Sequence, residues 1–226
     1  LTVGVGLAFA RAVHHEERRG HKTAGGAARV ASTDMWRVVV SLLLAVMASS
    51  VTFNAVTVAL PKLFSERLTD LTTSPSLLGL ITAGVYLFGA LTQYNVGQLI
   101  DRTSLKRAFL PLAFSLAPLL YVASKVANAP LLIVSIGIVM AMFGLVTVND
   151  AMVGKYTTDE WRSRAYSVRY FIGFTAAGLA VAMVAWLHEQ GGFTLVLQSF
   201  AALCVLVMIA ALVFPQERAA VAAPAE

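Results

Sequence analysis

The stretch SLLGLITAGVYLFGALTQYNVGQLI at residues 76–100, followed at once by DRTSLKR at residues 101–107, decides the class of fold. As an α-helix, residues 76–100 would be about 37 Å long at roughly 1.5 Å per residue. That length is enough to cross a hydrocarbon core of about 30 Å. Strands of a membrane barrel are only about 10 residues long and alternate in polarity. This stretch does not alternate, so it predicts a transmembrane helix that ends in a charged turn.

The rest of the chain repeats this pattern. Its composition is 58% hydrophobic and 13% charged, whereas an ordinary soluble domain is about 25% charged. Its mean hydropathy of +0.76 is typical of a membrane protein. Proline is expected to end the first apolar block at Pro61 and to kink the third at Pro111 and Pro118. We therefore predict an all-α integral membrane protein with a six-helix bundle over residues 35–214, its spans lying near 35–60, 76–100, 108–126, 131–153, 168–187 and 193–214.

The lysines and arginines are distributed unevenly between the loops. Of the 17, only Lys62, Arg67 and Lys125 lie on one side of the predicted spans; the others lie in 11–37, 101–107, 154–169 and the tail at 215–226. Basic residues accumulate in cytoplasmic loops of membrane proteins. We expect the richer side, including both terminal segments, to be cytoplasmic, in a bacterial inner membrane. The net charge of +5 then reflects membrane topology and does not indicate binding to nucleic acid.

Two segments precede the first span. Residues 1–13 are apolar but fall short of the roughly 20 residues that a spanning helix needs. They also lack the basic start and cleavage site of a signal peptide, so we interpret them as the end of a truncated transmembrane helix. Residues 14–34 are charged and rich in glycine and alanine, with no apolar periodicity. They are predicted to form a flexible cytoplasmic linker.

The charged turn after the second span has residues suited to a gate. Gly97 would let two helices approach closely. Asp101 lies beside Arg102, with Lys106 and Arg107 close by in the sequence. A carboxylate there can pair with a cation or cap the N-terminus of a neighbouring helix. Contacts of this kind can hold one conformation of a bundle closed.

Residues 97–107, GQLIDRTSLKR, resemble the loop signature of the major facilitator superfamily. The family pattern is Gly-x-Leu-x-Asp-Arg-x-Gly-Arg followed by Lys or Arg. It lies between helices two and three and, in weaker form, between helices eight and nine. This chain departs from the pattern at Ser104, where the family has glycine, and at Leu105, where arginine is usual. Those departures suit the weaker copy in the second half.

A second stretch, DEWRSRAYSVRY at residues 159–170, resembles the family's segment before helix eleven. The similarity lies in an acidic residue followed by Arg162, Arg164 and Ala165, with Ser163 in place of a common glycine. Arg162 and Arg164 are predicted to be gating residues, together with those of the 97–107 loop. By this resemblance the six spans are helices seven to twelve, the C-terminal half of a 12-helix fold. The partner is then an N-terminal six-helix half.

The resemblance implies a secondary transporter, a permease or an efflux protein, that moves a small solute by alternating access. It implies no enzyme activity and no cofactor or metal, and the sequence contains no catalytic triad or metal-ligand cluster. Proton coupling is an expectation from the family alone. Drug efflux and solute uptake both stay open. The alternative is a non-transporting membrane protein such as a sensor, a scaffold or a subunit of a membrane enzyme.

Asp150 is the one acidic residue inside a predicted span, near its cytoplasmic end. A charged side chain in mid-bilayer costs about 2.5–3.5 kcal/mol on insertion scales, so such residues are functional candidates. Three roles stay open for Asp150: a gate network with Asp101, Arg102 and Arg107, a carrier of a coupling proton, or an interfacial carboxylate.

Polar residues on helical stripes indicate which spans line a cavity. Ser50, Asn54 and Thr57 share one face of the first span, and Tyr86 and Gln93 share one face of the second. We predict that Asn54, Tyr86 and Gln93 contact the solute. The alternative role for these side chains is hydrogen bonding between helices.

Overall fold

The computed structural model describes residues 32–156 and 159–213, which form five helices and the short turns between them. Each helix contains a segment long and apolar enough to cross a membrane, so the predicted all-helical membrane fold is confirmed. The predicted truncated helix at 1–13 and the tail at 215–226 lie outside the described residues. The same holds for the linker, except that residues 32–34 already belong to the first helix. The helices are α2 (Ser32–Arg67), α3 (Pro75–Arg102), α4 (Leu105–Ala123), α5 (Asn128–Tyr156) and α6 (Asp159–Val213).

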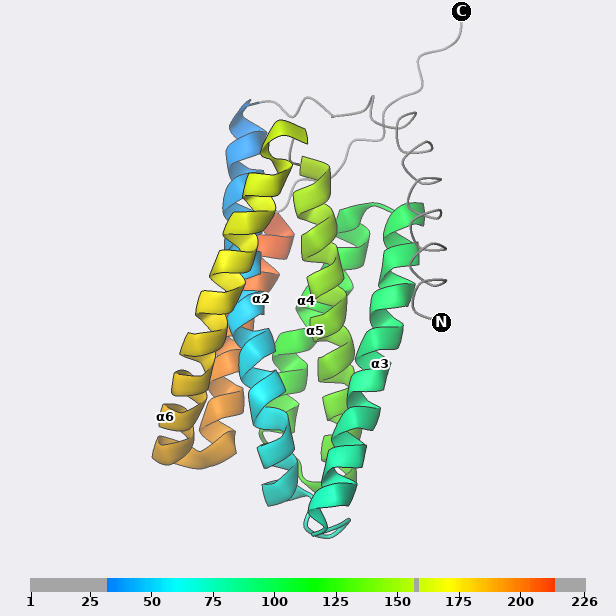
Figure 1. Cartoon of the computed structure of the whole chain (residues 1–226), viewed down its shortest axis with the longest axis vertical. Coiled ribbons are helices and arrows are strands. Elements are labelled where there is room, and N and C mark those ends of the chain that lie inside the picture. Colours follow the sequence, from blue (N-terminus) through cyan, green and yellow to red (C-terminus); the bar gives the residue numbers. More distant parts are fainter. Residues whose placement is uncertain (1–31, 157–158, 214–226) are drawn as a thin grey trace, which may run out of the picture. The chain divides into compact units, whose positions relative to one another are not determined.

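Helix α6 consists of two arms that meet at a glycine pair. The backbone is non-helical at Gly191 and Gly192, and Gly192 has a φ of 62°. Glycine adopts positive φ without the steric cost that a Cβ brings. The chain therefore reverses there, as the yellow and orange arms of α6 show in Figure 1. We call residues 159–190 the first arm and residues 193–213 the second arm; they contain the last two predicted spans.

The expectation that Pro61 ends the first span is wrong, because α2 continues through it to Arg67. Pro61 lies on the exposed side of α2, whereas Leu60, Leu63 and Phe64 are almost fully buried. Packing of these large side chains holds the last turns of the helix in place. Helix α4 likewise runs through Pro111 and Pro118.

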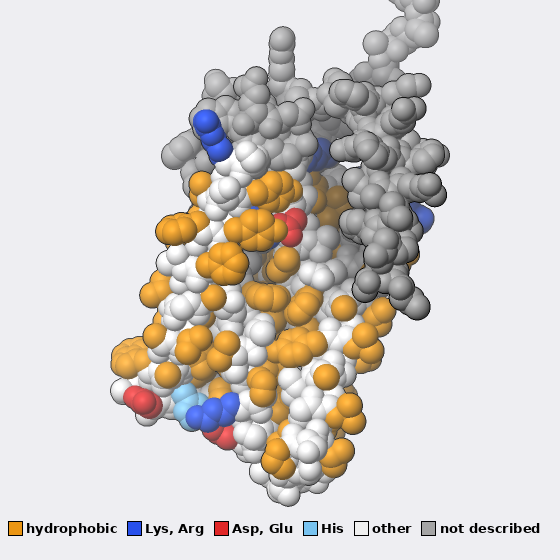
Figure 2. All heavy atoms as spheres, in the orientation of Figure 1, with side chains coloured by type: hydrophobic (Ala, Val, Ile, Leu, Met, Phe, Trp, Pro, Cys, Tyr) orange, Lys and Arg blue, Asp and Glu red, His pale blue; other side chains and the backbone are white. Residues whose placement is uncertain are grey.

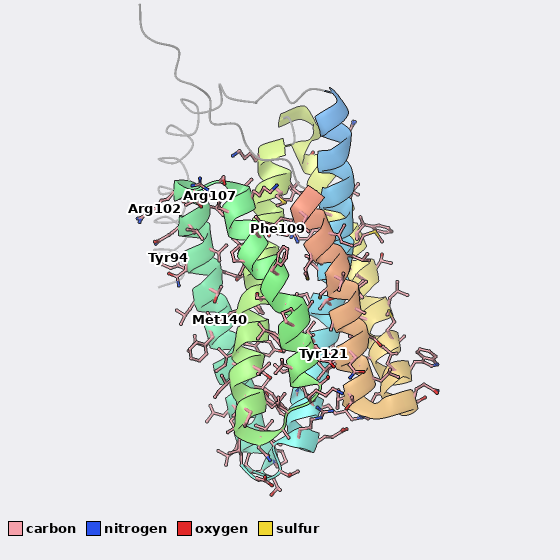
Figure 3. All side chains as sticks on the ribbon, turned by 180° about the vertical axis from the view of Figure 1, so that it is seen from behind. Tyr94, Arg102, Arg107, Phe109, Tyr121 and Met140 are labelled. Atoms are coloured by element: carbon pink, nitrogen blue, oxygen red, sulfur yellow. The ribbon has the colours of Figure 1, made fainter. Side chains whose placement is uncertain are left out.

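The core lies where α2 packs against α6, α3 against α5, and α4 against both α5 and α6. Phe109 of α4 points into this bundle (Figure 3). In lipid the apolar surroundings remove most of the hydrophobic drive between helices, so close packing and interhelical hydrogen bonds provide the stability. The largest fully buried side chains are Phe64, Phe109, Phe200, Leu60, Leu68, Leu105, Leu116, Leu120, Leu131, Ile138 and Leu145.

Two ends of the bundle can be distinguished by their turns. The basic end has the turn between α3 and α4, the end of α5 and the start of α6, and the far end has the turns near 68–74, 124–127 and 191–192. At the far end, Nη1 of Arg67 donates to the carbonyls of Ala123 and Ser124, both at 3.1 Å. Its Nη2 donates to Oγ1 of Thr194 at 2.7 Å. Because helix C-termini carry partial negative charge, this arginine caps α4 while tying it to α2 and α6.

Helix α3 and the first arm of α6 leave broad apolar faces exposed. Leu80 and Leu87 project from α3, and Phe171, Phe174 and Trp186 project from the first arm. Figure 2 shows apolar side chains spread along the flank of the bundle, with charged side chains mostly near its two ends. This is the distribution that a lipid bilayer requires.

Candidate functional site

The predicted gating loop lies at the basic end, between α3 and α4. Asp101 and Arg102 form the last turn of α3, Arg107 lies in the first turn of α4, and all three are exposed. Figure 3 shows Arg102 and Arg107 close to this turn. Ser104 is the N-cap of α4, and its Oγ accepts a hydrogen bond from the backbone N–H of Arg107 at 3.4 Å. Serine is among the preferred N-cap residues, so it has a local role at the position where the family signature has glycine.

Gly97 does not provide the close helix contact expected of it within the described residues. A Cβ built at Gly97 would meet no atom within 4 Å, whereas one at Gly89 would lie 2.8 Å from Cγ1 of Val139. The reason is that α3 packs against α5 at Gly89, while Gly97 faces away from the other described helices. Close approach of α3 and α5 therefore depends on Gly89.

Asp150 forms an ion pair with Arg169, which joins α5 to the first arm of α6. The Arg169 side chain is 14% exposed and that of Asp150 is 38% exposed. Arg169 also lies over the ring of Tyr170, with its guanidinium carbon 5.5 Å from the ring centroid. The pair is thus partly screened from solvent and positioned by an aromatic neighbour.

Two further contacts hold the same helices together. The hydroxyl of Tyr166 donates to the backbone carbonyl of Asp150 at 3.1 Å. A Cβ at Gly154 would lie 3.2 Å from that hydroxyl, so the small residue leaves room for the tyrosine. Together with the ion pair, these contacts fasten α5 to the first arm of α6 near the basic end.

Arg169 is not among the predicted site residues, although it lies in the same DEWRSRAYSVRY stretch, two residues after Ser167. In a helix, residues seven apart lie on nearly the same face, so Arg162 was a usable signal for Arg169. Arg164 is exposed, and the side chain of Arg162 lies outside the described residues. The partner of Asp150 comes from this segment, and its predicted role in a gate with residues 101–107 stays a prediction.

A second cluster, of polar and aromatic side chains, lies between α2, α3 and α5. The hydroxyl of Tyr86 donates to the backbone carbonyl of Thr57 at 3.0 Å. Phe143 of α5 packs beside this contact, with ring centroids 5.2 Å from Phe53 and 6.2 Å from Tyr86. Tyr86 and Thr57 are respectively 11 and 10 residues from the far ends of their helices. At roughly 1.5 Å per residue, both lie about 15 Å deep, near the bilayer midplane.

The predicted cavity residues occupy different surroundings. Asn54 is half-buried, and its Nδ2 donates to the backbone carbonyl of Ser50 at 2.8 Å. Gln93 is half-buried and lies two turns from Tyr86 toward the basic end of α3. Tyr86 makes the interhelical hydrogen bond that was its alternative role. Contact of these three residues with a solute stays a prediction.

Comparison with known proteins identifies the family of this bundle. A family model described as Major Facilitator Superfamily matches residues 38–226. The chain belongs to the major facilitator superfamily. None of the curated proteins compared matches it. Members of this family are membrane transporters and not enzymes, so the bundle is part of an integral membrane transport protein.

Proposed function

We propose that this chain is the C-terminal six-helix half of a secondary transporter that moves a small solute by alternating access. The observation that carries the proposal is the family match over residues 38–226. In such proteins two bundles rock about a site near the midplane of the membrane. With the two arms of α6 counted as separate spans, α2 to α6 would supply the six membrane-crossing segments that such a half requires.

The exposed apolar faces support a second bundle as partner. Helix α3 has the smallest buried share among the candidate spans, at 28%. Lipid covers such faces equally well, but α3 also presents the polar-aromatic cluster at the midplane. An N-terminal bundle facing α3 and the first arm of α6 would enclose that cluster, making it one wall of a solute cavity.

In this proposal the charged groups at the basic end form the cytoplasmic gate. The α3–α4 turn has Asp101, Arg102, Lys106 and Arg107 around it, with Gly97 about one turn earlier in α3. The Asp150–Arg169 pair joins α5 to α6 at the same end of the bundle. Opening the cytoplasmic side would require such contacts to rearrange. The excess of lysine and arginine at the basic end supports a cytoplasmic position for this gate, with the protein in a bacterial inner membrane as part of the proposal.

A transport assay tests the proposal. A strain lacking the gene is compared with its parent for growth on candidate solutes and for susceptibility to toxic compounds. A hit is then measured as uptake into proteoliposomes containing the purified protein, with and without a proton gradient. Gradient-driven, saturable flux is the expected result. Absence of flux for every compound that distinguishes the strains would favour the non-transporting alternative.

The variant Asp150→Asn, measured in the same assay, distinguishes the three possible roles of Asp150. If Asp150 acts in the gate, the variant changes flux while its pH dependence stays the same. If Asp150 carries a proton, the pH dependence is lost as well. Unchanged flux with unchanged pH dependence would exclude both roles and leave an interfacial carboxylate.

A further inference from the structure

Helix α2 carries an interruption in its hydrogen bonding near the midplane. In a continuous α-helix, the N–H of residue 61 would donate to the carbonyl of residue 57. Residue 61 is proline, which has no N–H, and so the Thr57 carbonyl loses its partner within the helix. Lipid offers no donor to replace the missing one. The Thr57 carbonyl is therefore paired only where another helix, or water in a cavity, supplies a donor.

Tyr86 of α3 is that donor, with its hydroxyl 3.0 Å from the Thr57 oxygen. Without this bond, α2 would contain an unpaired carbonyl next to a proline, where helices bend most readily. The bond also joins two helices that otherwise touch only over a short stretch. The Tyr86 side chain thus stabilises the straight conformation of α2 at the turn from Thr57 to Pro61.

The two parts of α2 on either side of this site are held very differently. Beyond it, Leu60, Leu63 and Phe64 are buried in the core, and Arg67 is bonded to α4 and α6. Before it, over residues 46–56, the buried positions hold mostly small side chains: Ala48, Ser49, Thr52 and Ala55, with Val46 and Val56. Small side chains make fewer dispersion contacts. The buried side chains of residues 46–56 are therefore held by fewer dispersion contacts each than those of residues 60–64.

Two unpaired hydroxyls lie in this part of α2, one within residues 46–56 and one at Thr57. Oγ of Ser49 and Oγ1 of Thr57 are buried and have no hydrogen-bond partner among the described residues. Oγ1 of Thr52 forms a hydrogen bond of 3.6 Å with the thiol of Cys204 in the second arm of α6, so it is paired with a weak partner. Buried polar groups are normally paired, so this conformation leaves hydrogen-bonding capacity in α2 that another conformation can use.

We propose that residues 57–61 form a hinge in α2, that Tyr86 latches it straight, and that residues 46–56 are the arm that swings when the latch opens. In this role Tyr86 is a positioning residue, because it acts through α2. The use of the hinge in alternating access rests on the proposed function. The hinge itself is a property of this chain and is tested without any transport measurement.

Cys204 provides the probe. It is the one cysteine of the sequence, is fully buried, and packs against Thr52 on the moving arm. Its rate of reaction with N-ethylmaleimide in the folded protein, in detergent, reports how often the arm leaves α6. Tyr86→Phe removes only the hydroxyl, and the labelling rate should rise about tenfold, as expected when a buried carbonyl loses its donor.

Pro61→Ala isolates the cause, because it restores the N–H that the Thr57 carbonyl lacks. In that background Tyr86→Phe should change the Cys204 labelling rate less than twofold. A tenfold increase in both backgrounds, or no increase in the native one, would overturn the latch. Tyr94→Phe is the matched control, since Tyr94 is an exposed tyrosine of the same helix. If it accelerates labelling as much as Tyr86→Phe, the proposal also fails.

Hydrogen–deuterium exchange covers the case in which Pro61→Ala does not fold. Comparing the native protein with Tyr86→Phe, exchange should increase in residues 46–56 and stay unchanged in α4. A uniform increase over all helices would show general destabilisation in place of a hinge.

Discussion

At the scale of single residues, the Asp150–Arg169 ion pair links two helices at the basic end. A surface ion pair contributes about 0–1 kcal/mol. Breaking a fully buried pair by removing one partner costs about 3–5 kcal/mol, because the remaining charge is left unpaired. With Arg169 at 14% exposure and Asp150 at 38%, this pair lies between those limits.

We therefore expect Asp150→Asn to lower the free energy of unfolding by about 1–3 kcal/mol. The measurement is the thermal midpoint of the purified protein in detergent. Asp101→Asn is the control, since Asp101 is exposed, and its effect should stay within about 0.5 kcal/mol. In the double variant with Arg169→Gln the loss should be smaller than the sum of the two single losses. Additive losses would contradict a direct interaction.

At the scale of elements, α3 is held to α5 by close approach at one glycine. A Cβ at Gly89 would lie 2.8 Å from Val139 and 2.9 Å from the ring of Phe143. Distances this short force the neighbouring side chains or the helices to shift. Because Phe143 also packs against Phe53 and Tyr86, such a shift would reach the polar-aromatic cluster.

Gly89→Ala should consequently destabilise the bundle by about 1–3 kcal/mol, the usual range for overpacking. Gly84→Ala, on the same helix, is the matched control because its Cβ would meet nothing within 4 Å. That control should be neutral or slightly stabilising, since alanine favours helix over glycine by about 0.5–1 kcal/mol. The thermal midpoints of the two variants are compared. Equal midpoints would show that α3 and α5 are not in close contact at Gly89.

At the scale of the whole molecule, the distribution of charge predicts the orientation in the membrane. Thr69 is exposed in the turn at the far end, and Ser163 is exposed at the basic end. The excess of basic residues places the basic end in the cytoplasm.

Cysteine labelling of intact cells measures this orientation. In a Cys204→Ala background, an impermeant maleimide should label Thr69→Cys from outside. Ser163→Cys should be labelled only after the membrane is permeabilised. The reverse pattern would place the basic end outside and would contradict both the proposed gate and the cytoplasmic linker.

The sequence alone determined the fold class, the approximate spans and the difference between the two ends. These depend on runs of apolar residues and on counts of lysine and arginine, which are local properties of the chain. Even the reversal inside α6 follows from a local feature, the Gly191–Gly192 pair between two apolar blocks.

Only the tertiary structure decided which polar groups are partners. The bond from Tyr86 to the Thr57 carbonyl spans 29 residues, and the pairing of Asp150 with Arg169 joins two helices. Pro61 shows why such contacts escape sequence reasoning. By local sequence rules Pro61 predicts the end of a helix, yet α2 continues to Arg67. The last turns of α2 are buried against other helices. The hydroxyl of Tyr86 supplies the hydrogen-bond donor that Pro61 lacks. A local sequence pattern shows which polar group lacks a partner, whereas tertiary packing determines which distant residue pairs with it.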